Sequence, residues 1–208
     1  MARRYVARLP HWLVGGIFLV VAIRQIGGVP TVQATFDWTQ QKVNPDAKTL
    51  ADFMERVKEY VALHQKLERT LPPLPKEADP KIVDKHQRNL APRIVAARVG
   101  AKQGDIFLPP MQEFIRRHTH RIFAAPEGKT IAAAILDENP VGLKVSVNSR
   151  YPDEVPVSTM PPEFLAALPK LPEEIEYRFV GDRLVLLDVH AHLIVDFVEK
   201  VLPGVKGP

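Results

Sequence analysis

Residues 173–198 read EEIEYRFVGDRLVLLDVHAHLIVDFV, and this stretch decides the fold. From position 175 to 179 apolar residues alternate with charged ones, the period of two that is typical of a half-buried strand. Gly181 and its neighbour predict a tight turn. Every odd position from 185 to 197 is then apolar, which predicts a second strand whose odd positions face a core.

Four polar residues fall on the even positions of that second strand: Asp188, His190, His192 and Asp196. Residues two apart on a strand point to the same side, about 7 Å from each other, so the two imidazoles could reach one ion. Asp188 or Asp196 would add a carboxylate, and this ligand set suits a divalent metal such as zinc.

A metal site formed by Asp188, His190 and His192 is therefore one hypothesis, and an open coordination position there would make the protein a metal-dependent hydrolase. The other interpretation is a solvated polar face that binds nothing. The pattern favours this second interpretation, because the helical His-Glu-x-x-His pair of many zinc enzymes is missing.

Other catalytic chemistry finds no support in the sequence. The chain has no cysteine, which excludes disulfides, thiol catalysis and thiolate metal ligands. It also lacks a Gly-x-Ser-x-Gly elbow, a phosphate-binding loop and a dinucleotide fingerprint. We therefore predict no catalytic residue and no organic cofactor, and we favour a non-catalytic protein over an enzyme.

The first half of the chain is predicted to be helical. Residues 46–70 carry an apolar seam at spacings of three and four: Leu50, Phe53, Val57, Tyr60, His64, Leu67 and Leu71. We interpret this segment as an amphipathic helix packed on its own domain, because a coiled coil needs more heptads. On that seam His64 is interpreted as a packed histidine, not a ligand.

A second helix is predicted over residues 81–103, after a proline-rich joint. Asp79 is its expected N-cap, and Pro80 occupies the first turn. Pro92 removes a backbone donor in the middle of this helix, so we expect a kink or a break near Leu90.

Further helices are predicted at residues 109–123, 129–136 and 163–168, and a first strand at 143–148. The expected fold is α+β: a helical N-terminal half, residues 46–136, packed on a small antiparallel sheet formed by residues 141–198. In terms of domains, residues 1–34 form a leader, 35–140 a helical region and 141–208 a sheet region, with 35–208 as one folded unit.

The leader has the order of a secretory signal. Arg3, Arg4 and Arg8 precede a 12-residue apolar run, and small residues follow near Ala34. The run is shorter than the about 20 residues of a membrane-spanning helix, which favours a cleaved signal. Arg24 keeps the alternative open, namely an uncleaved anchor with membrane contact through residues 9–23.

The charge of the chain excludes one class of partner. The leader holds four of the 28 basic residues and none of the 24 acidic ones, so the remainder is formally neutral. A basic surface for nucleic acid is therefore not predicted. The 20 prolines, about twice the usual share, lie between periodic segments and mark connections.

Three stretches are similar to exported bacterial proteins of unassigned function: residues 84–91 with 104–107, residues 176–181, and residues 193–197. This resemblance implies export and carries no activity, cofactor or catalytic residue. We therefore expect an extracytoplasmic protein, periplasmic or secreted, or else anchored in the inner membrane by its N-terminus. Its expected role is binding or structural, with a protein of the cell envelope as partner.

Overall fold

The computed structural model describes residues 44–138, 144–151, 153 and 160–202, which all belong to one compact unit spanning Lys42–Pro208. The leader predicted at residues 1–34 lies outside the described residues. The elements, in chain order, are α1 (Pro45–Glu68), α2 (Pro80–Ala97), α3 (Pro109–Ala124), α4 (Gly128–Glu138), α5 (Pro162–Ala167), β1 (Ile175–Val180), β2 (Arg183–Asp188) and β3 (Leu193–Val198).

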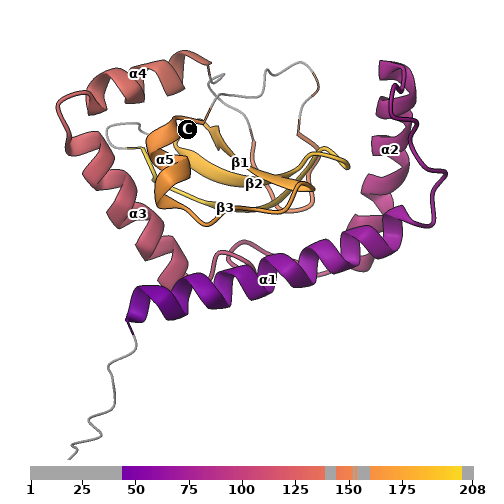
Figure 1. Ribbon diagram of the computed structural model, residues 1–208, viewed down its shortest axis with the longest axis horizontal. Helices are drawn as coiled ribbons and strands as arrows, with labels where there is room; N and C mark the ends of the chain where they lie inside the picture. The colour runs from indigo at the N-terminus through magenta and orange to yellow at the C-terminus, as the bar shows by residue number, and fades with distance from the viewer. Residues whose placement is uncertain (1–43, 139–143, 152, 154–159, 203–208) are drawn as a thin grey trace, which may run out of the picture. The chain divides into compact units, whose positions relative to one another are not determined.

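The expected α+β fold is confirmed, with helices in the N-terminal part and an antiparallel sheet at the C-terminal end. Figure 1 shows α1 beneath the sheet, with α2 near one end of α1 and α3 near the other. The apolar side of α1, including Phe53 and Val57, is buried in the main core together with residues from both sheet and helices. The seam therefore packs within the domain, as predicted. None of the helices in these ranges is long and apolar enough to cross a bilayer.

Local sequence signals explain where the first two helices begin. The Asn44 side chain accepts the Asp46 N–H, and the Asp79 side chain accepts the Lys81 N–H, which confirms the predicted cap of the second helix. Of the kink or break predicted near Leu90, the break is wrong, because α2 continues through Pro92 and ends at Ala97; the kink stays a prediction. Packing of the helix against the core outweighs the missing hydrogen bond of the proline.

The second predicted strand, residues 185–197, is in fact two strands. The chain reverses between β2 and β3, and the sheet order is β1-β2-β3 with antiparallel neighbours. Asp188 closes this turn by accepting the Ala191 N–H at 2.7 Å, and His192 takes a positive φ of 54°. Apolar alternation across the turn concealed it in the sequence, because Val189 and Ala191 continue the pattern without forming strand.

Both faces of the sheet are buried, so the prediction that odd positions alone face a core is also wrong. Leu184 and Leu186 lie in the main core, whereas Val185 and Leu187 lie in a second apolar cluster with Tyr151. Segment 144–151 provides part of that second cluster. The polar even positions of the sequence pattern are therefore not a solvated face.

A bulge in the last strand changes the facing of its residues. Leu187 pairs with Ile194, but Leu186 pairs with Asp196, so Val195 is an extra residue. The bulge turns both Val195 and Asp196 toward the helical side, where Val195 joins the main core.

The strand predicted at 143–148 is absent from its described residues, 144–148. Asn148 takes a positive φ of 63°. The segment pairs with β3 through the Asn148 N–H and an Arg150–Leu193 bridge, and the Tyr151 N–H donates to the His192 carbonyl just before β3. The segment covers the edge of β3 without regular strand geometry.

Candidate metal centre

His64 and Glu68 lie one turn apart on α1, and this spacing places both side chains on the same face of the helix. His64 is fully buried, and its Nε2 lies 3.2 Å from Glu68 Oε2. Glu68 is partly exposed. Together they provide one imidazole and one carboxylate at the boundary between core and solvent.

Asp188, at the end of β2, fixes the orientation of His64. Its Oδ2 lies 2.6 Å from His64 Nδ1 and accepts the Tyr60 hydroxyl at 2.5 Å. Its Oδ1 accepts the Ala191 N–H. Because a carboxylate is an acceptor, Nδ1 of His64 carries the proton, and Nε2 points away from Asp188 toward Glu68.

The pKa values of the two donors follow from this buried arrangement. Burial lowers the pKa of His64, but the hydrogen bond and charge of Asp188, with those of Glu68, outweigh burial and hold it above its usual range. Burial and the Asp188 charge both raise the pKa of Tyr60, so its hydroxyl stays protonated and donates.

His190 reaches the same carboxylate from the turn between β2 and β3. Its Nδ1 lies 3.2 Å from Glu68 Oε1, and its ring centroid lies 5.3 Å from that of His64. This contact does not have the geometry of a hydrogen bond. The buried Nδ1 atom therefore has no hydrogen-bond partner among the described residues. A buried ring nitrogen without a hydrogen-bond partner destabilises the folded state unless another group or an ion binds it.

His64, Glu68 and His190 can together hold a metal ion. One ligand atom from each lies within 4.8 Å of the other two. In a tetrahedral zinc site with bonds of about 2.0–2.1 Å, neighbouring ligand atoms are about 3.3–3.4 Å apart. His64 Nε2 lies 3.2 Å from Glu68 Oε2, and His190 Nδ1 lies 3.2 Å from Glu68 Oε1, so each imidazole is close to this spacing from one of the two carboxylate oxygens.

A third imidazole lies beside the group. His86, on α2, is buried, and its Nε2 lies 3.3 Å from Glu68 Oε1. It is outside the set of mutually close ligand atoms. Glu68 is thus approached by histidines from α1, α2 and the β2–β3 turn.

The structure separates the residues that the sequence pattern grouped together. His190 lies in the cluster, whereas Asp188 contacts His64 and uses both oxygens for protein donors. His192 points elsewhere: its Nδ1 lies 3.4 Å from Asp153 Oδ1, and its ring stacks on Tyr151. The premise that His190 and His192 share one face of a strand does not hold, because both lie in a turn.

Asp196 has a different task. It is fully buried and accepts the N–H groups of Gly104, Ile106 and Phe107 at 2.8–2.9 Å. Burial raises the pKa of Asp196, while these backbone donors act in the opposite direction. Asp196 anchors the segment between α2 and α3, and none of these contacts involves the histidine cluster.

Sequence reasoning missed His64, Glu68 and His86. The signal for the first two was the i, i+4 spacing of a histidine and a carboxylate on a predicted helix. His64 lies on the apolar seam of its helix, which predicts a packed core residue. No local sequence pattern predicts that α2 and the β2–β3 turn lie beside His64 and Glu68.

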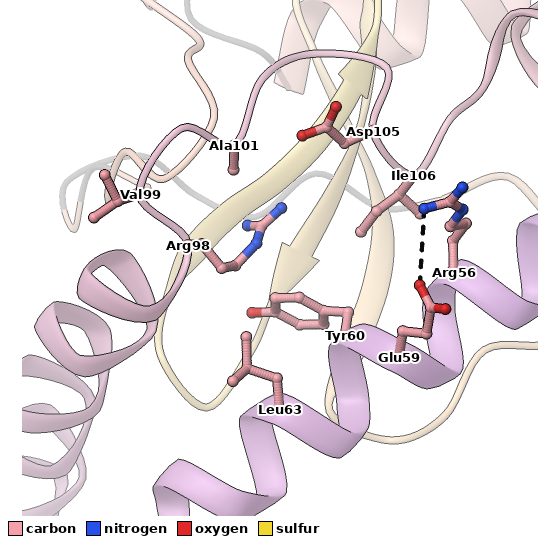
Figure 2. Close-up of a pocket in the computed structure, with 9 residues that line it drawn as sticks. All are labelled: Arg56, Glu59, Tyr60, Leu63, Arg98, Val99, Ala101, Asp105 and Ile106. Carbon is pink, nitrogen blue, oxygen red and sulfur yellow. Dashed lines mark ion pairs between the residues drawn. The ribbon is translucent and has the colours of Figure 1, made fainter.

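Tyr60 connects the cluster to a surface pocket of about 250 Å³. Figure 2 shows its ring between Leu63 and Arg98. The Arg98 guanidinium lies 5.1 Å from the centre of the Tyr60 ring and also donates to Asn148 and to the Val195 carbonyl. These contacts hold Tyr60, and through it Asp188, in place.

Comparison of the chain with protein-family models, curated proteins and solved structures finds no match.

Proposed function

We propose that the protein binds one divalent transition-metal ion of the zinc class through His64, Glu68 and His190. The observation that carries this proposal is the convergence of two imidazole nitrogens and one carboxylate, with the buried Nδ1 of His190 lacking a hydrogen-bond partner in the described part of the chain. Imidazole with carboxylate is a ligand set that suits zinc and its neighbours.

The contact between Asp188 and His64 supports the proposal. A metal-binding histidine commonly donates its other ring N–H to a carboxylate, which orients the ring and makes the coordinating nitrogen more basic. The contact from Asp188 to His64 Nδ1 has this arrangement, and it leaves Nε2 for the ion.

Within this proposal the protein is a non-catalytic, metal-binding protein that acts outside the cytoplasm, periplasmic, secreted or tethered by its N-terminus. The signal-like order of residues 1–34 supports the location. A metal-dependent hydrolase is the second candidate. One observation favours it: two histidines and one glutamate form a known type of catalytic zinc site, in which water takes the fourth position.

Metal content and affinity test the proposal. The full chain, stripped with a chelator and then titrated with Zn²⁺ against a chromophoric competitor, is expected to bind one ion per chain. His190→Ala and Glu68→Gln are the best variants, because both side chains are partly exposed and their loss leaves the core intact. Each is expected to weaken Zn²⁺ binding at least tenfold.

His192→Ala is the matched control, since it removes an imidazole from the same turn but outside the cluster. It is expected to keep the affinity of the unmodified protein. Folded protein that binds no Zn²⁺, or a His190→Ala variant that binds as tightly as the parent, would overturn the proposal.

A further inference from the structure

The N-terminal half of α2, residues 80–89, has only one buried side chain, that of His86. Ile82, on the same half, is 48% exposed. Apolar packing of α2 begins at Leu90 and continues with Ala91 and Ile94. The position of this half therefore depends mainly on the polar contacts of His86 and its neighbours.

Those contacts lead to α1 and to the β2–β3 turn. His86 Nε2 lies 3.3 Å from Glu68 Oε1, the same oxygen that lies 3.2 Å from His190 Nδ1. The next residue, Gln87, donates from Nε2 to the Val189 carbonyl at 3.3 Å. Both contacts are long for hydrogen bonds, so this half of α2 is held loosely against α1 and the turn. Its shorter contact, from Arg88 to Asp153 at 2.7 Å, is exposed and leads to another segment.

We propose that His86 is the fourth ligand of the metal ion, and that binding of the ion clamps the N-terminal half of α2 onto α1 and the β2–β3 turn. The proposal rests on the metal site of the proposed function. A Zn²⁺ ion beside Glu68 needs one more donor to complete a tetrahedron. His86 is the buried imidazole already within 3.3 Å of that carboxylate.

The consequence concerns the chemistry of the site. Four protein ligands, three histidines and one glutamate, close the coordination shell and leave no position for a reactive water. The ion then joins three elements that are distant in the sequence. This arrangement describes a structural or sensing metal site and argues against the hydrolase alternative.

Hydrogen exchange of the α2 amides, measured with and without Zn²⁺ on the full chain, tests the clamp. In the unmodified protein Zn²⁺ is expected to slow exchange in residues 83–89 at least tenfold. In His86→Ala the ion is expected to bind at least tenfold more weakly. In the same His86→Ala variant, saturating Zn²⁺ is not expected to slow the exchange of these amides. His86→Gln serves the same purpose if the alanine variant folds poorly.

His118→Ala is the matched control, because this imidazole contacts the Phe114 carbonyl within α3. Co²⁺ in place of Zn²⁺ adds a spectroscopic test, since four-coordinate Co²⁺ absorbs visible light more strongly than five- or six-coordinate Co²⁺. The unmodified protein is expected to give the strong spectrum and His86→Ala the weaker one.

The outcomes separate the two proposals. If the unmodified protein binds Zn²⁺ and His86→Ala binds it as tightly, with the same protection of α2, His86 is not a ligand and the three-residue site stands. If the unmodified protein binds no Zn²⁺ at all, both proposals fail.

Discussion

At the scale of single residues, Asp188 shows how one buried carboxylate serves both fold and site. It accepts from Tyr60, His64 and Ala191, so it closes a turn and orients an imidazole at the same time. Replacement of Asp188 by Asn would direct an amide N–H group at one or more of these donors. We therefore expect Asp188→Asn to weaken Zn²⁺ binding by about 10–100-fold, because His64 loses its orientation.

The control for this prediction is Tyr60→Phe, which removes one donor and leaves the contact between His64 and Asp188. Competition titration with Zn²⁺ should show less than a tenfold change for Tyr60→Phe. Equal affinities for the Asp188→Asn variant and the parent would mean that His64 is oriented by other groups.

Asp196 illustrates a purely structural carboxylate. Its two oxygens accept three N–H groups of residues 104–107, and an amide in its place cannot accept all of them. We expect Asp196→Asn to lower the free energy of unfolding by about 2–4 kcal/mol, measured by urea denaturation, since buried donors lose their partners. The neighbouring Asp105→Asn, which affects an exposed contact to Lys102, should cost less than about 1 kcal/mol. Similar losses in both variants would contradict this assignment.

At the scale of elements, α2 contains a local conflict that packing overrides. Pro92 lies inside the helix and cannot donate to the carbonyl of Arg88, four residues earlier. Pro92→Ala should therefore raise the free energy of unfolding by about 1–3 kcal/mol, checked by chemical denaturation. Pro80→Ala, at the first turn where proline is favoured, should have little effect. A loss of stability in Pro92→Ala would show that the proline shapes the helix for the packing of Leu90.

The hairpin shows why strand patterns are ambiguous at turns. Apolar residues at odd positions predicted one continuous strand, but Asp188 and Ala191 form a turn that keeps the same alternation. The period of two therefore survives in the sequence while the chain reverses. His190 and His192 consequently point to different neighbours, and of the two only His190 lies beside Glu68.

At the scale of the whole molecule, the proposed metal ion would join α1, α2 and the β2–β3 turn. A ligand that binds only the folded state adds about 2.7 kcal/mol at a concentration 100 times its dissociation constant. For a domain of this size we expect such Zn²⁺ to raise the melting temperature by roughly 5–10 °C. Differential scanning calorimetry of the parent and of His190→Ala measures this, and an equal shift in both would place the ion elsewhere.

The leader leads to a prediction about processing. If residues 1–34 are a cleaved signal, intact mass analysis of the protein recovered from cells should show a chain that begins near Thr35. An intact chain that starts at Met1 in the membrane fraction would instead support the anchor.

The sequence by itself determined the order of helices followed by sheet, the N-cap of α2 and the alternation in β1, because these depend on neighbours within a few residues. From residue type alone it also raised the hypothesis of a metal site at Asp188, His190 and His192, which stays a prediction. Only the tertiary structure decided which histidines meet, since His64, His86 and His190 converge through packing of α1, α2 and the β2–β3 turn. Contacts between distant segments depend on the packing of the whole core, which a pattern over a few neighbouring residues does not predict.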